Sequence, residues 1–206
     1  MADYARFRVK IRIPRIVANL PRDLEQLRVA VANSRRDVGL PAEPEDVEEE
    51  AGELAEAVSE GVAQHSFLRD EKGIYLRERN IRGLLKETGR MLGKRIAELV
   101  RHGIYVVPEK IYLTRGGGPV KQADGTDVKC GKVGTIRGSR SIVREAEYLE
   151  DVEAEFTVEV IPYVLRRLGG EEGLRELFEY GQRVGLGGDR SLGEGKFELV
   201  EFRRVG

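Results

Sequence analysis

Arg6-Phe7-Arg8-Val9-Lys10-Ile11-Arg12-Ile13 alternates strictly between cationic and apolar residues. Successive side chains of a β-strand point to opposite faces, so this stretch predicts a strand with one apolar face and one cationic face. Like charges in a row repel one another, which favours a surface that binds a polyanion. The alternative is an outer face whose charge is balanced by acidic neighbours. The four candidate binding residues of this stripe are Arg6, Arg8, Lys10 and Arg12.

The overall composition bounds the class of protein. A chain of 206 residues can bury a core as a single domain spanning 1–206. The net charge of −1 excludes a histone-like protein that is basic throughout, because cations and carboxylates are instead segregated along the chain. The segment 43–60 carries nine carboxylates and no cation. Charged residues reach 34%, while Asn, Gln, Met and Cys are scarce, a pattern that indicates a thermophilic source.

Cysteine usage and hydropathy bear on the compartment. Cys130 is the single cysteine, so the chain can form no internal disulfide and does not read as a secreted scaffold. No apolar run approaches the roughly 18 residues that span a membrane, and no signal peptide precedes the first strand. We therefore expect a soluble cytoplasmic protein, in the host cytoplasm if it is viral, with no membrane partner.

Hydrophobic periodicity predicts an alternation of strands and helices. Pro14 is expected to end the pairing of the first strand, and 150–151 to turn between two antiparallel strands at 142–149 and 154–161. The other expected strands are 66–69, 74–77, 104–107, 110–114 and 196–204, and the expected helices are 23–38, 45–63, one from about residue 80, 94–102 and 171–184. This order predicts an α+β fold, a ferredoxin-like or RRM-like βαββαβ antiparallel sheet core with a helical insertion at 22–64.

The segment 115–144 differs in character from the rest. It contains seven glycines and has a net charge of +5, from seven cations and two carboxylates. Glycine makes a backbone mobile and the charge disfavours a compact structure, so we expect a flexible basic hairpin, or thumb. A disordered surface loop is the alternative. The candidate binding residues in this segment are Arg115, Lys121, Lys129, Lys132, Arg137 and Arg140.

Two further segments carry a resemblance. The first runs from the hairpin 70–76 into the helix that contains Asn80-Ile81-Arg82-Gly83-Leu84-Leu85-Lys86. The second is the glycine-rich segment 185–195, which lies between a predicted helix and the last strand. Together they resemble the RAMP superfamily of CRISPR-associated proteins, which has RRM-like cores. The glycine segment is not a P-loop, because it follows a helix and precedes a strand. Its backbone either contacts phosphates or packs closely against the helix that precedes it.

The resemblance implies nucleic-acid binding, and the departures from it limit how close the relationship is. The chain has Arg77-Glu78-Arg79-Asn80 where the family usually has small hydroxyl residues, and the helical pair at 23–63 has no counterpart that we can map. These features suggest a divergent relative, and a phage-encoded protein of a thermophile that coats single-stranded DNA fits them.

Catalysis has little support in the sequence. His65 and His102 show neither triad nor metal-ligand spacing, so we expect a non-enzymatic protein without metal or cofactor. One of these histidines as the general base of an RNA-cleaving site is the minor alternative, since some RAMP proteins cleave RNA with a histidine. A functional thiol at Cys130, between Lys129 and Lys132, is another.

The sequence therefore predicts a sequence-independent single-stranded nucleic-acid-binding protein that coats DNA as a homo-oligomeric ring or filament. A guide-RNA-binding or RNA-processing subunit of a CRISPR complex is the alternative, and the ligand is either DNA or RNA. A third possibility is a structural oligomer in which 43–60 meets a basic surface of the next subunit. Besides the stripe and the thumb, the candidate binding residues are Arg82, Lys86, Arg190 and Lys196.

Overall fold

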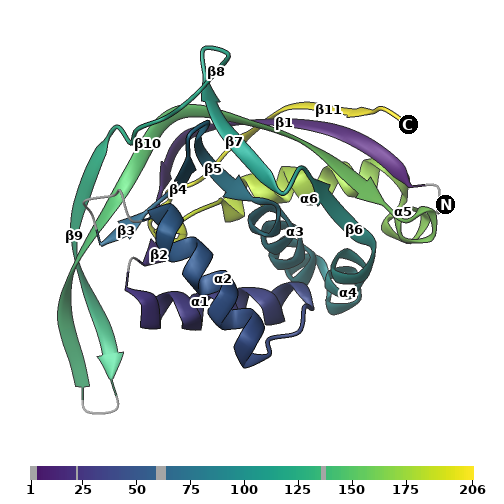
Figure 1. The fold of residues 1–206 in the computed structure, drawn as a ribbon. Helices are drawn as coiled ribbons and strands as arrows, with labels where there is room; N and C mark the ends of the chain where they lie inside the picture. Colours follow the sequence, from purple (N-terminus) through teal and green to yellow (C-terminus); the bar gives the residue numbers. More distant parts are fainter. Residues whose placement is uncertain (1–3, 22, 59–63, 136–137) are drawn as a thin grey trace.

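The structure, a computed structural model, describes residues 4–21, 23–58, 64–135 and 138–206, of which 57, 58, 130–135 and 138–143 are described by their backbone alone. The fold is α+β, with helices packed against a large, mainly antiparallel sheet (Figure 1). Its main path runs in the order β11-β1-β10-β7-β5-β4.

The predicted βαββαβ core is confirmed. Its six elements are β1 (Ala5–Val17), α3 (Glu78–Leu92), β7 (Lys110–Arg115), β10 (Gly138–Val160), α6 (Gly170–Val184) and β11 (Glu198–Arg204). The first strand lies in the middle of the sheet, paired with β10 on one side and β11 on the other. The short strand β6 (Ile104–Val107) pairs with β10 as well, next to β7 along the chain. This is the strand order of a ferredoxin-like sheet, extended at one edge by β5 and β4.

The apolar half of the β1 alternation forms the core, as its period predicts. Phe7, Val9, Ile11 and Ile13 are fully buried, in one cluster with Leu85 of α3 and Phe178 of α6. Burying a side chain of this size contributes about 1.5–3 kcal/mol. Helix α6 contacts α3 at Gly181, where a Cβ would lie in ordinary van der Waals contact with Thr88 Oγ1, at 3.4 Å.

Two predictions about the sheet were wrong. The strands expected at 142–149 and 154–161 are one strand, β10, because Asp151 at φ 50° kinks it without turning it. Both halves pair with β1, Val152 with Ile13 and Glu150 with Arg15. Pro14 likewise does not end β1, because pairing with β11 stops at Arg12 and a proline is tolerated on a free edge.

The chain between β1 and α3 contains β2 (Leu20–Pro21), α1 (Leu24–Val38), α2 (Pro44–Val58), β3 (His65–Ser66), β4 (Leu68–Asp70) and β5 (Gly73–Arg77). Of these, α1 and α2 lie within the predicted helical insertion at 22–64. Helix α1 begins where the Asp23 side chain accepts a hydrogen bond from the Gln26 backbone and ends at Gly39, whose φ is 80°. Leu27 and Val31 of α1 pack with Leu54 of α2 and Tyr75 of β5 in a second core. The last part of the second predicted helix, 59–63, lies outside the described residues.

The remaining elements are α4 (Lys94–Gly103), α5 (Pro162–Leu168), β8 (Gly118–Pro119), the 3-10 turn η1 (Arg190–Leu192) and β9 (Gly125–Thr135). Helix α5 was not predicted, because its seven residues are too few to show a clear helical period. Strands β9 and β10 form a long hairpin, with Tyr148 opposite Gly125 and Gly138 opposite Thr135. This hairpin begins ten residues after the predicted start at 115, because β7 and β8 occupy the intervening chain.

Candidate nucleic-acid interface

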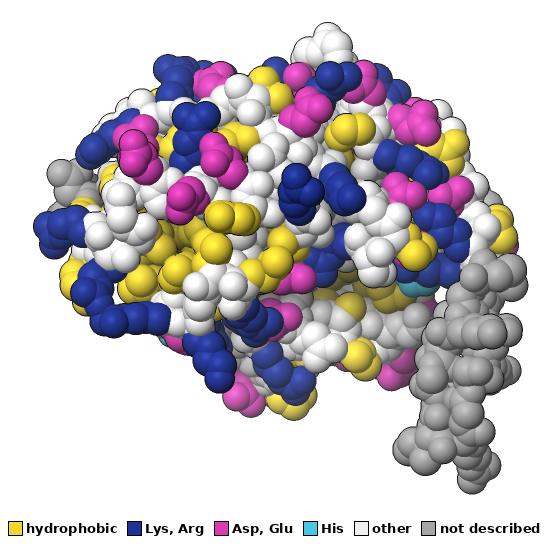
Figure 2. All heavy atoms as spheres, turned by 180° about the vertical axis from the view of Figure 1, so that it is seen from behind, with side chains coloured by type: hydrophobic (Ala, Val, Ile, Leu, Met, Phe, Trp, Pro, Cys, Tyr) yellow, Lys and Arg dark blue, Asp and Glu magenta, His cyan; other side chains and the backbone are white. Residues whose placement is uncertain are grey.

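The cationic stripe of β1 is paired with carboxylates of the neighbouring strand. The β1–β10 register places glutamates opposite Arg6, Lys10 and Arg12 and Thr157 opposite Arg8, whose carboxylate partner is the next residue on the same face of β10. The nitrogen–oxygen distances are 2.9 Å for Arg6–Glu159, 2.5 Å for Arg8–Glu155, 3.0 Å for Lys10–Glu153 and 2.7 Å for Arg12–Asp151. Over the upper part of the face shown in Figure 2, cationic and acidic side chains lie interspersed. This geometry matches the alternative of a charge-balanced outer face.

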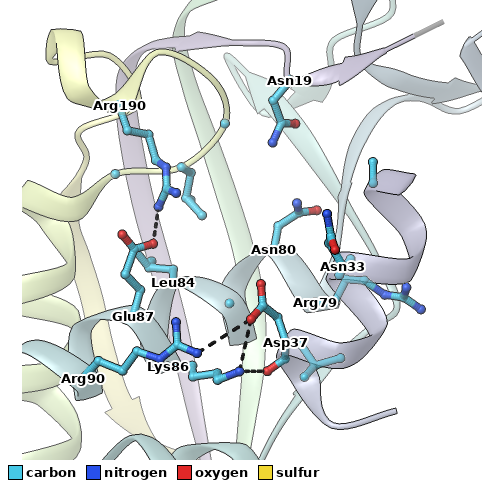
Figure 3. A pocket seen from close by; sticks show the side chains of 17 residues that line it. Asn19, Asn33, Asp37, Arg79, Asn80, Leu84, Lys86, Glu87, Arg90 and Arg190 are labelled. Carbon is cyan, nitrogen blue, oxygen red and sulfur yellow. Dashed lines mark hydrogen bonds and ion pairs between the residues drawn. The ribbon is translucent and has the colours of Figure 1, made fainter. Parts of the chain in front are cut away.

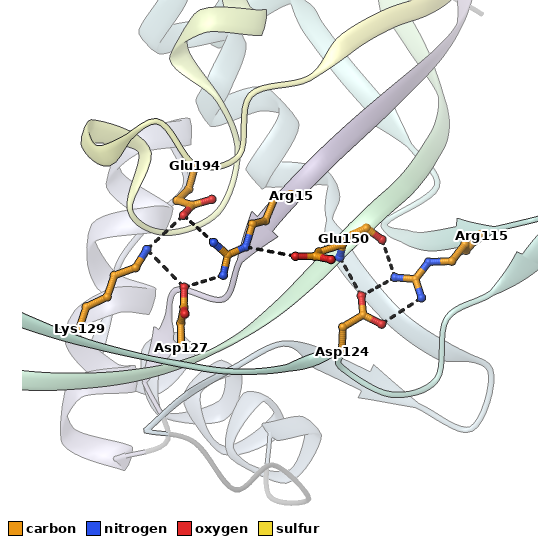
Figure 4. Close-up of polar contacts among 7 residues, drawn as sticks. All are labelled: Arg15, Arg115, Asp124, Asp127, Lys129, Glu150 and Glu194. Atoms are coloured by element: carbon orange, nitrogen blue, oxygen red, sulfur yellow. Dashed lines mark hydrogen bonds and ion pairs between the residues drawn. The ribbon is translucent and has the colours of Figure 1, made fainter.

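The cations at the base of the hairpin are also paired. Lys129 Nζ lies 3.1 Å from a carboxylate oxygen of Glu194 and 3.5 Å from one of Asp127 (Figure 4). Arg15 of β1 contacts the same two carboxylates, at 3.1 and 2.6 Å. These contacts join the hairpin, β1 and the glycine-rich segment in one ionic network.

A second set of contacts lies beside this network, and it involves Arg115, another predicted binding residue. Arg115 holds Asp124 at 2.5 Å, and this hydrogen bond lowers the pKa of the Asp124 carboxyl below its ordinary value. The same guanidinium donates to the Glu150 carbonyl oxygen (Figure 4). Both contacts of Arg115 therefore hold the chain at the start of the β9–β10 hairpin.

The other predicted residues are scattered. Arg82 donates to the backbone carbonyls of Val38 and Arg101, a structural role between α1, α3 and α4. Lys121 and Lys196 are exposed. The side chains of Lys132 and Arg140, and the whole of Arg137, lie outside what the structure describes.

The glycine-rich segment 185–195, here called the glycine loop, packs against the end of β1. Gly188 donates its backbone N–H to the Val17 carbonyl at 2.7 Å. A Cβ on Gly187, whose φ is 79°, would lie 2.5 Å from the same oxygen. Glycine is therefore required here for close backbone packing, and the packing partner is β1 rather than the preceding helix.

Two cavities open on either side of this loop. The first, about 290 Å³, lies between α1, α3 and the loop (Figure 3). The second, about 620 Å³, lies between α3, α6 and the loop. Asn19, Glu87, Gly187 and Arg190 line both, so the two cavities are adjacent and meet at the Arg190–Glu87 ion pair. We call the two together the glycine-loop groove.

Cations outnumber carboxylates in this groove. Its six cations are Arg79, Lys86, Arg90, Arg144, Arg183 and Arg190, and its three carboxylates are Asp37, Glu87 and Asp189. Asp37 serves both Lys86 at 3.4 Å and Arg90 at 3.7 Å, whereas Arg183 has no carboxylate partner among the described residues. Arg90 and Arg190 keep 58% and 39% of their side chains exposed. The remaining cations, Arg79, Arg144 and Arg190, each have a carboxylate within 2.7 Å, so the charge that is not fully neutralised is that of Arg183 and Arg90.

A buried carboxylate fixes one wall of the groove. Glu50 of α2 is 6% exposed and accepts hydrogen bonds from three arginines: Arg35 at 2.9 Å, Arg77 at 2.6 Å and Arg79 at 2.5 Å. These contacts tie both helices of the insertion to the start of α3. Glu50 is thus a buried member of the acidic segment 43–60. The Arg79 guanidinium is directed toward this cluster and away from the cavity (Figure 3).

Sequence reasoning found two of the six groove cations, Lys86 and Arg190. It missed Arg79, Arg90, Arg144 and Arg183 as binding residues. Helical spacing could have found Arg90, because it lies four positions after Lys86 on the same helix. The others come from elements whose adjacency no local pattern reveals.

The histidines offer no evident catalytic grouping. Burial, and then the charge of Arg144, lower the pKa of His65 below its ordinary value. His102 is exposed and lies 3.3 Å from Glu98 on the same helix. In the parts of the chain that the structure covers, no three His, Cys, Asp or Glu side chains are grouped as metal ligands would be. Nor is any of the described helices long and apolar enough to cross a membrane.

Comparison with known proteins identifies the fold. No protein-family model and no curated protein matches the sequence. Among solved structures, the chain is similar to one in the cryo-EM structure of the type III-B Cmr-beta complex bound to cognate target RNA, with a TM-score of 0.53 and 14% identity. The match covers 98% of this chain but 61% of that one, so the protein spans about three fifths of its length. At this identity the likeness shows a common fold.

Proposed function

We propose that the protein binds single-stranded RNA in the glycine-loop groove and does not cleave it. The observation that carries the proposal is the excess of cations over carboxylates in two adjacent cavities, five against three once Arg79, which points away and pairs with Glu50, is set aside. Single-stranded nucleic acid is held by a cationic groove that follows its backbone, so this arrangement supplies the electrostatic part of such a site.

The groove is a better candidate than the β1 stripe. Each stripe cation already has a carboxylate within 3.0 Å, and a phosphate would have to displace it. In the groove, by contrast, Arg183 is unpaired among the described residues, and Arg90 lies 3.7 Å from the carboxylate of Asp37, which it shares with Lys86. A phosphate that binds beside either arginine gains attraction without first breaking a close ion pair.

RNA is favoured over DNA by the shared fold, since the solved complex that contains the similar chain is bound to target RNA. The protein would then act as one RNA-binding subunit of a larger assembly. A coat on single-stranded DNA uses the same groove chemistry, and the experiment distinguishes the two.

The test is fluorescence anisotropy with labelled oligo(U) and oligo(dT) of about 12 nucleotides, the size that one such domain covers. Titrations at about 50 and 200 mM salt should show tighter binding to RNA and a marked loss of affinity with salt. Recovered RNA should remain intact on a denaturing gel. Tighter binding to oligo(dT) would favour the DNA coat, and absence of binding to either at low salt would contradict the proposal.

A further inference from the structure

We propose that the cavity between α1, α3 and the glycine loop receives one nucleobase of the bound strand and selects adenine. This inference rests on the proposed function, because the base must arrive as part of a strand held in the groove. It adds a point of sequence specificity that the cationic track alone does not supply.

The distribution of asparagine is the first argument. The chain of 206 residues contains three asparagines, Asn19, Asn33 and Asn80, and all three line this one cavity. They come from three elements: the link after β1, helix α1 and the start of α3. The four glutamines of the chain lie elsewhere. All of the asparagines in a chain that contains few of them therefore lie around one cavity.

The amides retain hydrogen-bonding capacity. Asn80 uses its Oδ1 to accept from the Arg77 backbone at 2.8 Å, which leaves its NH₂ group available. Neither Asn19 nor Asn33 makes a side-chain hydrogen bond to any described residue. Figure 3 shows the three side chains along one side of the cavity, opposite Arg190. Donors and acceptors are thus presented together to whatever enters.

Gly83 is the second, independent argument. It lies within α3 and lines the cavity, and a Cβ there would meet no atom within 4 Å. Its φ is not positive, so neither packing nor backbone geometry requires glycine. A glycine inside a helix costs about 0.5–1 kcal/mol relative to alanine. Its effect in the folded protein is to keep this wall of the cavity bare, which leaves room for a flat ligand.

Size and charge fit a base attached to its backbone. At about 290 Å³ the cavity is near the lower limit of pockets that hold small organic ligands. Arg90 and Arg190 line it too and are partly exposed, so they can contact the flanking phosphates. The carboxylates of Asp37 and Glu87 are already occupied by Lys86 and Arg190.

Adenine is the base that amide side chains read best. An asparagine amide pairs with it through two hydrogen bonds, accepting from the N6 amino group and donating to N7. Uracil and guanine present a keto oxygen where adenine has the amino donor. Such a pair is worth at least about fivefold in affinity against a wrong base.

The test compares four RNA oligomers of about 12 nucleotides that are oligo(U) except for one central A, G, C or U. The wild-type protein should bind the A-containing oligomer at least about fivefold more tightly than the others. Asn33→Ala should remove this preference and leave the affinity for oligo(U) nearly unchanged, and Asn19→Ala provides a second such variant. Gln26→Ala, which removes an exposed amide from the same helix α1, is the matched control and should keep the preference.

Filling the cavity provides an independent check. Gly83→Leu should abolish the preference, while Gly52→Leu, at an exposed helical glycine of α2 with equally open space, should retain it. Equal binding of the four RNAs, a preference for another base, or an Asn33→Ala variant that still prefers A would overturn the inference and leave the proposed function intact. Absence of binding to every RNA would overturn the proposed function and this inference with it.

Discussion

The β1 stripe and the glycine-loop groove are both rich in cations, but they differ in how those cations are neutralised. On β1, the cations project at every second residue and β10 supplies a carboxylate for each. In the groove, the cations of α3, α6, β10 and the glycine loop outnumber the carboxylates that line the same cavities. A regular charge pattern within one strand can therefore be a device for pairing strands. A binding surface can be assembled from single charges that form no pattern at all.

The largest expected effect comes from breaking the wall of the groove. Glu50→Ala removes the acceptor shared by Arg35, Arg77 and Arg79. Three mostly buried guanidinium groups would then lie close together without the carboxylate between them. We expect a loss of about 3–5 kcal/mol in the free energy of unfolding, measured by urea denaturation. Glu53→Ala, at an exposed position of the same helix, is the control and should change stability little. Equal stability of the two variants would show that the cluster does not hold the wall.

The next effect tests the groove directly. Arg90→Ala combined with Arg183→Ala removes the two groove cations that lack a close carboxylate partner among the described residues, so RNA affinity should fall about tenfold or more, to a similar extent for every sequence. The salt dependence should weaken by about 1.4 in the slope of log affinity against log salt, the value for two lost contacts with a single strand. Arg175→Ala, on the outer part of α6, is the control. An unchanged slope would place the RNA elsewhere.

A smaller effect concerns the bare wall of the cavity. Gly83→Ala should raise the free energy of unfolding by about 0.5–1 kcal/mol, because alanine favours the helix and its methyl group meets open space. Gly52→Ala should give a similar gain in α2. Thermal denaturation of both variants measures this. A destabilised Gly83→Ala protein would mean that the glycine is needed for the fold itself.

The smallest effect is expected at the stripe. Arg8→Ala combined with Lys10→Ala should change RNA affinity by less than about twofold, because both side chains are engaged by carboxylates of β10. The same anisotropy titration measures it. A loss as large as that of the groove variant would reverse the comparison and restore the stripe as the phosphate track.

Much of the fold could be predicted from the sequence, because its signals are local. The β1 alternation, the helical periods and the glycine before the last strand each report on their own segment. The prediction placed a turn at 150–151, whereas Asp151 lies within a continuous strand and has a positive φ. The strand is seen to continue only from its ladder with β1. The site was harder to predict. Asn19, Asn33 and Asn80 are far apart along the chain, and their convergence depends on how the insertion packs on α3.

Strand β10 has a mechanical consequence. Its 23 residues rise about 3.3 Å each, so it extends for roughly 75 Å from the middle of the sheet to the far part of the hairpin. One end is clamped by the ladder with β1, and the hairpin base is braced by Arg15 and Lys129. A load on the hairpin is therefore borne by the same strand that carries the core. Because Glu194 contacts both Arg15 and Lys129, a displacement of the hairpin base also disturbs the contacts of the glycine loop.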